Sequence, residues 1–276
     1  MSMMTQEFTQ YVQTHHRDLC LDRACLLVAR AFQSDLDVGY YLHRIDAMAE
    51  EIYSRLLPGA GPDEVHDEIA EYLYLDCGYS GNVLNYYDAR NSFLNEVIER
   101  QLGIPISLSV LHMEVARRLG LAVWGVGLPM HFVVGGHYRG EVAYWDPFFS
   151  GARLSEEDCA ARVHNLSQGR IAFDPVFLSP LSARRLLLRL LTNLKMIFIQ
   201  RGQAQNALVV VEMILPLTPN PSLEIRDRGM IWLRMGDLSR ARVDLEFYLA
   251  ANPDADDADA VRLRLSQLGR SPGAHS

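Results

Sequence analysis

The clearest periodic pattern in the first third of the chain lies between Val38 and Leu57. Apolar residues recur there at helical spacing, at positions 38, 41, 42, 45, 48, 49, 52 and 56, and such a stripe predicts an amphipathic helix. The segment 58–62, rich in proline and glycine, ends it. Similar patterns predict helices over residues 7–33, with a break near His15–Asp18, and over residues 63–74 and 93–101. The N-terminal part is therefore predicted to be helical.

A different helical pattern begins at Pro105. Apolar residues at 106, 108, 110, 111, 115 and 119 cover most of the helix circumference, which is typical of a buried helix. Pro105 suits a first helical turn, and Gly120 after two arginines is a C-terminal stop. Ser107, just inside the start, could bond one of the unpaired N–H groups of the first turn.

Three short apolar runs after this helix predict strands. They span Ala122–Val126, Phe132–Val134 and Val142–Trp145, and the glycine-rich linker 135–140 predicts an antiparallel hairpin between the last two. A hairpin symmetric about residues 138 and 139 places His131 opposite Asp146, with Cβ atoms about 4.5–5.5 Å apart. A slip of one residue would separate the two side chains.

The segment Asp76–Ser92 is dense in glycine, asparagine and tyrosine, too long and too aromatic for a passive linker. In one interpretation Tyr86 and Tyr87 pack, while Asp88, Asn91 and Ser92 cap the helix 93–101. In the other the segment forms one wall of a cleft in front of His131. The two interpretations are compatible.

The C-terminal third is helical and repetitive. A shift of 34 residues superimposes Met196 on Met230, Gly202 on Gly236 and Pro219 on Pro253, and 34 is the period of tetratricopeptide repeats. About two repeats fit, so Ser182–Leu191 and Asp257–Leu268 are expected to flank them.

Ser155 predicts the start of a further helix before the repeats, and a loop over 165–180 suggests a domain boundary. The expected parts are 1–75 (helical), 76–180 (core) and 181–276 (repeats).

The composition and charge of the chain exclude several classes of function. The net charge of −8 and pI of about 5.6 argue against a nucleic-acid-binding surface. The chain begins without the pattern of a signal peptide, and its densest apolar segment, Leu186–Leu194, is interrupted by Arg189 and too short to span a bilayer. A cytoplasmic protein without membrane contact is expected. The four cysteines form no Cys-x-x-Cys pair and no phosphate-loop spacing occurs, so neither metal, disulfide nor cofactor is predicted.

A helix start that faces a histidine and an aspartate on neighbouring strands is the layout of papain-type catalysis, and here the chain resembles a known family. It is similar to the bacterial transglutaminase-like proteins with C-terminal tetratricopeptide repeats that are named as regulators of sirC expression (SirB-type). Matching stretches include Leu36–Val38, Gly81-Asn82, Tyr86–Asp88, Asn91-Ser92, Gly103–Ser109, Ala116–Leu121, His131-Phe132 and Asp146–Phe148. The resemblance implies an α+β transglutaminase-like domain, in which a helix packs on an antiparallel sheet, followed by helical repeats.

The resemblance also implies a catalytic cysteine at the start of the buried helix, roughly where Ile104, Pro105 and Ile106 stand here. No cysteine occurs between Cys77 and Cys159. Cys77 could replace the missing thiol only if its loop folded across the cleft.

The candidate catalytic residues are accordingly His131 and Asp146, with Ser107 as the nearest nucleophile. His131 alone would usually be structural. Ser107 could equally be a capping or packing residue, because a hydroxyl inside a helix often bonds its own backbone. Asn82, Tyr86, Tyr87, Asp88 and Asn91 are the expected cleft wall.

Two classes of function remain. The first is a non-catalytic interaction protein that binds a protein or peptide partner through its repeats. The second is a hydrolase or acyl transferase that uses His131 and Asp146 with Ser107 or a loop residue. The missing cysteine favours the first, and the histidine–aspartate pair keeps the second open.

Overall fold

The N-terminal part of the computed structural model is helical, and the structure describes residues 3–15 and 18–268. Residues 16 and 17, inside the predicted break, lie outside the described residues; α1 ends at Thr14 and α2 begins at Leu21. The helices are α1 (Met3–Thr14), α2 (Leu21–Arg30), α3 (Val38–Arg55) and α4 (Pro62–Ala70), which continues into a π-helical turn, η1 (Glu71–Asp76). The Asp37 side chain caps α3 by accepting from the Tyr40 N–H at 3.1 Å.

The centre of the first domain is α6 (Pro105–Arg118). All residues from Pro105 to His112 are buried, as the apolar pattern predicted. Before it come β1 (Ser80–Gly81), a 3₁₀ turn η2 (Ala89–Ser92), α5 (Leu94–Arg100) and β2 (Leu102–Gly103), and β1 pairs with β2 in parallel. The chain thus crosses over and returns to the start of α6.

Within the described residues, five strands form one antiparallel sheet in the order β6-β5-β4-β3-β7. They are β3 (Trp124–Val126), β4 (Val133–Tyr138), β5 (Glu141–Asp146), β6 (Ala152–Leu154) and β7 (Pro180–Leu181). Val133 and Tyr144 face a core with α7 (Glu156–Ser167) and the 3₁₀ turn η4 (Pro175–Leu178). Val134 and Trp145 face the opposite side. Both sheet faces are therefore covered, which confirms an α+β fold.

The predicted hairpin is present, but its predicted register is wrong by two residues. Val134 pairs with Trp145 rather than with Ala143, and the strand continues to Tyr138. The turn is Arg139-Gly140, both with positive φ (52° and 81°), the conformation of a tight two-residue hairpin. Gly135, assigned to the linker, lies inside β4, where it pairs with Trp124 and Tyr144. The Trp124 indole requires a glycine there, because a Cβ would lie 2.4 Å from Nε1.

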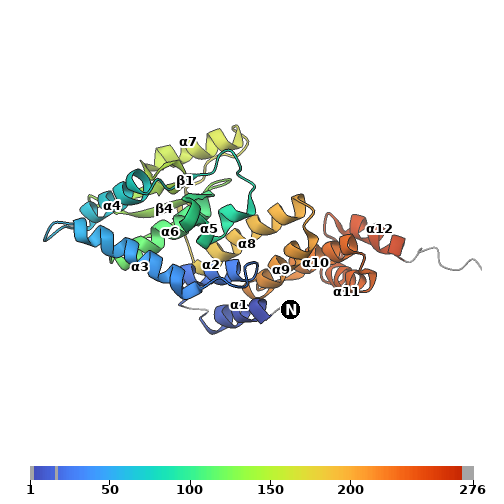
Figure 1. Cartoon of the computed structure of the whole chain (residues 1–276). Coiled ribbons are helices and arrows are strands. Elements are labelled where there is room, and N and C mark those ends of the chain that lie inside the picture. Colours follow the sequence, from blue (N-terminus) through green and yellow to red (C-terminus); the bar gives the residue numbers. More distant parts are fainter. Residues whose placement is uncertain (1–2, 16–17, 269–276) are drawn as a thin grey trace, which may run out of the picture.

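The repeats extend from the first domain as a row of helices (Figure 1). They comprise α8 (Ala183–Gln200), α9 (Ala204–Ile214) with the 3₁₀ turn η5 (Leu215–Leu217), α10 (Ser222–Met235), α11 (Leu238–Ala251) and α12 (Ala258–Leu268). The flanking segment expected at Ser182–Leu191 continues without interruption to Gln200, so it is the first half of α8.

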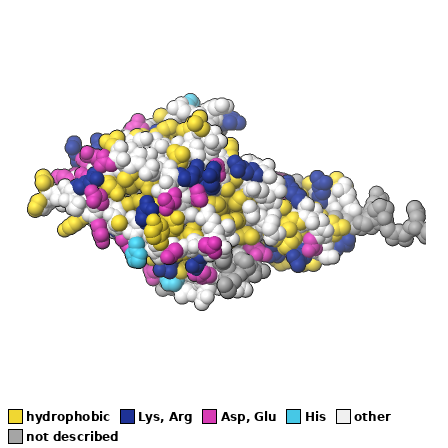
Figure 2. All heavy atoms as spheres, in the orientation of Figure 1, with side chains coloured by type: hydrophobic (Ala, Val, Ile, Leu, Met, Phe, Trp, Pro, Cys, Tyr) yellow, Lys and Arg dark blue, Asp and Glu magenta, His cyan; other side chains and the backbone are white. Residues whose placement is uncertain are grey.

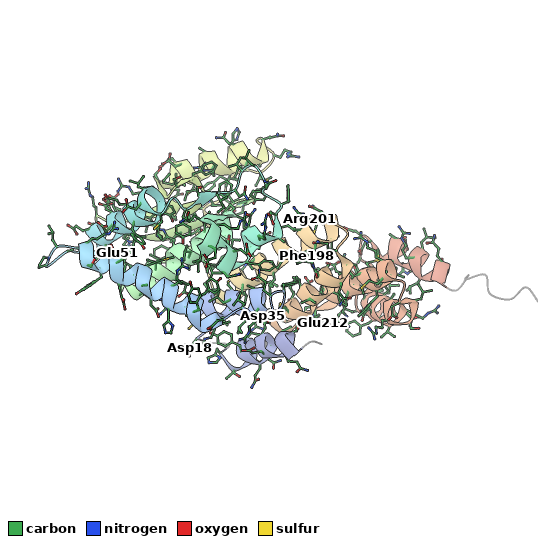
Figure 3. The ribbon with its side chains drawn as sticks, viewed as in Figure 1. Asp18, Asp35, Glu51, Phe198, Arg201 and Glu212 are labelled. Carbon is green, nitrogen blue, oxygen red and sulfur yellow. The ribbon has the colours of Figure 1, made fainter. Side chains whose placement is uncertain are left out.

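The junction between the two parts is apolar. The Phe198 ring, labelled in Figure 3 where α8 meets the first domain, lies 5.3 Å from Phe32, which lies 5.2 Å from Phe93. Buried leucines of α8 belong to the same core as α2 and α6. Hence α8 is shared between the first domain and the repeats.

The surface carries both signs of charge. On the face shown in Figure 2, acidic and basic side chains alternate over both parts, with a short row of basic side chains near the middle. Among the described helices, none combines the length and the apolar character needed to cross a membrane.

Candidate functional site

Asp146 ends β5 with its side chain fully buried. Its Oδ1 accepts hydrogen bonds from the backbone N–H groups of Phe148 and Phe149, at 3.2 and 3.3 Å, and so caps the 3₁₀ turn η3 (Pro147–Phe149). Its Oδ2 lies 2.8 Å from Nε2 of His131. The predicted contact between His131 and Asp146 is confirmed.

The contact forms although the predicted register was wrong. His131 precedes β4 in a turn closed by its N–H to the Leu128 carbonyl, at 3.1 Å, and Met130 has a positive φ of 60°. A displacement by two residues keeps each strand position on the same face of the sheet, so the pairing error did not reverse the side-chain direction. The turn then brings the imidazole to the carboxylate.

Because a carboxylate only accepts hydrogen bonds, Nε2 of His131 carries the hydrogen that Asp146 binds. Nδ1 is then the acceptor nitrogen, and no side chain or backbone group among the described residues bonds to it. His131 also lines a cavity of about 590 Å³. The pair therefore fixes the orientation of a ring that lines this cavity, and in the neutral ring it leaves Nδ1 as the acceptor that a general base or a ligand-binding histidine needs.

Arg162 of α7 is a third member of this group, and no pattern in the sequence indicated it. Its Nη2 lies 3.2 Å from Oδ2 of Asp146, and its guanidinium lies 4.1 Å from the centroid of the Phe149 ring. The buried carboxylate is thus compensated from two directions. Arg162 and Asp146 meet only because α7 packs on the sheet.

At the start of α6 the cavity is lined by Pro105 and Ile106. Neither carries a nucleophile. The Ser107 hydroxyl donates to the carbonyl of Asn91, at 2.6 Å, and accepts from the N–H of Ile104, at 3.1 Å. These are the bonds of a capping residue, the alternative role weighed for Ser107, and Ser107 is not among the residues that line the cavity.

The segment Asp76–Ser92, rich in tyrosine, forms one wall of the cavity through Tyr86 and Tyr87. The three polar residues predicted with them, Asn82, Asp88 and Asn91, do not line the cavity. Asn91 Nδ2 donates to the carbonyls of Asn85 and Tyr86, at 2.7 and 3.1 Å, and its Oδ1 accepts from Asn82, at 3.0 Å. They hold the segment in shape.

The predicted capping of the helix 93–101 is wrong. Asp88 caps the preceding 3₁₀ turn instead, by accepting from the Arg90 N–H at 3.0 Å, and Phe93 at the N-cap of α5 provides no side-chain bond. The chain forms a separate short turn before α5 begins, so the capping residues lie one element too early.

Cys77 lies in a different environment from the cavity. It is half-buried at the end of η1, its backbone N–H donates to the Tyr72 carbonyl, and burial raises the pKa of its thiol. The residues that line the cavity do not include it. Folding of its loop across the cleft is therefore not observed.

A buried layer supports the sheet behind the site. His66 stacks on Trp145 with ring centroids 4.1 Å apart, and Nδ1 of His112 lies 2.7 Å from the Tyr74 hydroxyl. Burial, with a smaller effect of His66, lowers the pKa of His112 to about 3, and burial also lowers the pKa of His66. Both rings are consequently neutral near pH 7.

Several cavity residues escaped the sequence reasoning. They come from segments far apart in the chain: Val83, Met130, Phe149, Leu166, Arg189 and Asn193. One signal was available, because Arg189 interrupts the densest apolar segment, and a charge at such a position usually has a specific partner or task. Within residues 3–15 and 18–268, no cluster of three or more histidine, cysteine or acidic residues could hold a metal ion.

A buried helix start, a His–Asp pair on the adjoining sheet and a helical repeat arm together define a transglutaminase-like domain joined to tetratricopeptide repeats. Residues 40–192 match the transglutaminase-like superfamily, and residues 194–266 match a tetratricopeptide repeat family. The chain belongs to the transglutaminase-like superfamily and, within it, to the UPF0162 proteins.

UPF0162 proteins of other bacteria resemble the chain over most of its length. It is 37% identical to a UPF0162 protein of Xylella fastidiosa (strain 9a5c), over 91% of this chain and 90% of the relative. It is 26% identical to the UPF0162 protein YchA of Escherichia coli (strain K12), over 89% and 90%. F-box only protein 21 of Mus musculus is 36% identical over 35% of this chain and 17% of its own length. No solved structure matches.

Proposed function

We propose that this protein is a non-catalytic regulatory protein, whose transglutaminase-like cleft binds a ligand without converting it while its repeats bind a protein partner. One observation carries the proposal: the α6 start presents Pro105 and Ile106 to the cavity, and the Ser107 hydroxyl is engaged by the backbone. Covalent catalysis needs an activated nucleophile within reach of the base. None of the described residues that line the cavity is a serine, threonine or cysteine, so the base lies there without a nucleophile of these types.

In this proposal His131 binds the ligand through a hydrogen bond and takes no part in a reaction. Its Nδ1 would accept a hydrogen bond from a bound N–H or O–H group, and Asp146 would keep the ring in the right tautomer. The role of the repeats rests on what such repeats generally do, which is to bind proteins. A regulatory role in the cytoplasm agrees with the resemblance to regulators of sirC expression, and it belongs to the same proposal.

The ligand is expected to be apolar in part. Most cavity residues are apolar or aromatic, and several large ones are exposed around its opening: Val83, Tyr87, Met130 and Phe149. Exposed apolar groups gathered at one opening usually mark a binding site. A peptide or a segment of another protein would offer apolar side chains that fit such an opening.

The first test is an activity screen with peptide amides and esters. The purified full-length protein should give no turnover above that of a His131→Ala variant. Turnover that disappears in His131→Ala would overturn the non-catalytic proposal.

The second test concerns binding. Peptides selected from a displayed library on the full-length protein should lose about ten-fold in affinity when Tyr87, which is 61% exposed, is changed to alanine. Tyr53, 70% exposed on α3, is the matched control, and Tyr53→Ala should bind normally. Equal binding by Tyr87→Ala and wild type would place the peptide site elsewhere.

A second candidate function is hydrolysis or acyl transfer with His131 as base and Ser107 or a residue of the 82–88 loop as nucleophile. The free Nδ1 of His131 at the cavity favours it. The Ser107 version requires the hydroxyl to leave the Asn91 carbonyl. In the activity screen this candidate predicts turnover that is lost in both His131→Ala and Ser107→Ala.

A further inference from the structure

The cavity contains one cation that no acidic group compensates. Arg189 of α8 lines the cavity, half-buried, and its Nη2 donates to the carbonyls of Leu128 and His131, at 2.6 and 2.7 Å. Its guanidinium also lies 5.5 Å from the centroid of the Phe132 ring. No carboxylate among the described residues forms an ion pair with it.

Carboxylates pair with several half-buried arginines of this chain but not with all of them: among the described residues Arg184, on the same helix, bonds only the carbonyls of Pro216 and Leu217, and it does not line the cavity. The chain carries an excess of acidic residues, with a net charge of −8. Other half-buried arginines, such as Arg118, Arg162 and Arg228, pair with carboxylates. Carbonyl dipoles stabilise a guanidinium but leave its charge in place, and a partly desolvated charge gains most from an anion.

A second group beside Arg189 is also without a partner. Asn193 lies four residues further along α8, on the same helix face, and it lines the same cavity. Its amide bonds to no group among the residues that the structure describes. An arginine and an amide one turn apart offer the donors that a carboxylate accepts in pairs.

The surroundings restrict what can carry that carboxylate. Arg189 is the one arginine among the described residues that line the cavity, and Asp146, which contacts His131, is fully buried and engaged by His131 and Arg162. A smaller cavity of about 90 Å³ shares Tyr86, Tyr87 and Asn193 with the first and continues to Met196 and Gln200. The space is therefore longer than one side chain, mostly apolar, and cationic at one point.

We infer that the cleft binds the C-terminal end of a peptide or protein, with the terminal α-carboxylate on Arg189 and Asn193 and large apolar side chains against Tyr86, Tyr87 and Phe149. This inference rests on the proposed function and adds the ligand class. A chain terminus supplies a carboxylate directly beside apolar side chains, which matches the cavity better than an acidic side chain does.

The test uses the full-length protein and a library that displays peptides with free C-termini. A selected peptide, labelled with fluorescein at its N-terminus, is measured by fluorescence polarisation as the free acid and as the C-terminal amide. Loss of the charge-assisted bonds should weaken binding of the amide by about ten-fold or more. Wild-type protein suffices for this comparison, so it does not depend on the folding of a variant.

Two variants assign the effect to residues. Arg189→Met should bind acid and amide equally, and Asn193→Ala should lower the preference for the acid. Arg185 is exposed on the same helix, and Arg185→Met is the matched control that keeps the preference. Asn193→Ala removes no hydrogen bond within the described residues, so it remains informative if Arg189→Met does not fold.

The outcomes separate this inference from the proposed function. Equal binding of acid and amide to wild type, with both lost in Tyr87→Ala, overturns the carboxylate site and leaves the binding cleft standing. A preference for the acid that persists in both Arg189→Met and Asn193→Ala also overturns it. If every selected peptide binds Tyr87→Ala as well as it binds wild type, no peptide binds at the cleft. That outcome would overturn both this inference and the proposed function.

Discussion

At the scale of single residues, the geometry of the site follows from the groups that bond to the buried carboxylate of Asp146. Asp146 is fully buried, and its two oxygens contact His131, Arg162 and two backbone N–H groups. Such a carboxylate orients whatever bonds to it, because turning away would leave a charge without a partner. The direction of the His131 ring is therefore a consequence of Asp146.

The orientation of His131 can be tested directly. Nitrogen-15 NMR of the imidazole should show the tautomer protonated at Nε2, because Asp146 accepts there. In Asp146→Leu the ring loses this acceptor, and a mixture of tautomers is expected. A wild-type ring protonated at Nδ1 alone would contradict the pair.

Acid should destabilise the protein through His112. Its pKa is about 3 in the folded state, against about 6.5 for an unperturbed histidine. Between these values the unfolded chain binds a proton that the folded chain does not, so stability is lost as the pH falls below about 6.5, by up to about 1.4 kcal/mol per pH unit.

Urea unfolding at pH 7, 6 and 5 measures this loss. The free energy of unfolding should depend less on pH in His112→Leu than in wild type. His43, exposed on α3, is the control, and His43→Leu should keep the wild-type dependence. An identical pH dependence in His112→Leu would show that another group is responsible.

At the scale of elements, an ion cluster joins three helices of the first domain. Arg118 at the end of α6 bonds Asp22 of α2 at 2.7 Å and Asp46 of α3 at 2.6 Å, and it also reaches Glu114 at 3.2 Å. Asp22 and Glu114 are nearly inaccessible to solvent. The helices therefore share one cation as well as apolar contacts.

Removing that cation should cost much stability. Arg118→Met leaves the Asp22 and Glu114 carboxylates buried without Arg118, and we expect a loss of about 3–5 kcal/mol in chemical denaturation. Arg117 is largely exposed and contacts Glu114 alone, so Arg117→Met should cost less than about 1 kcal/mol. Equal effects would mean that the cluster does not join the helices.

At the scale of the whole molecule, α8 belongs to both parts. Its buried residues Leu186, Leu190 and Leu194 lie in the core that α2 and α6 also line. The same helix carries Lys195, which bonds Glu224 and Asp227 of α10, both at 2.7 Å. Arg189, also on α8, bonds the loop that carries His131. The candidate site and the repeats are thus attached to one rigid element.

A fragment that begins at Ser182 should therefore fold poorly or associate. It would expose the leucine face of α8, and repeats need neighbours to bury such faces. Analytical ultracentrifugation and thermal melting of residues 182–276 provide the measurement, with the full-length protein as the control. A monomeric fragment with a sharp cooperative melt would show that the repeats are independent.

Local sequence was sufficient to predict the features that neighbouring residues determine, such as helix periodicity, helix caps and the repeat period. The 3.6-residue stripe predicted α3, Pro105 and Gly120 bounded α6, Ser155 capped α7, and the 34-residue period indicated the repeats. The approach of His131 to Asp146 was also predictable, because the side-chain period of two is robust to the error of two residues in register.

Tertiary structure decided what depends on distant segments. Gly135 of β4 lies against the indole of Trp124, eleven residues away in sequence, and only a glycine admits that ring there. Arg162 reaches the site because α7 packs on the sheet, and Arg189 reaches it because α8 lies against the loop that carries His131. Ser107 turns inward because Asn91 offers its carbonyl there. Periodicity records which face of an element is buried, but the partner across that face is chosen by packing and charge compensation, which no local pattern contains.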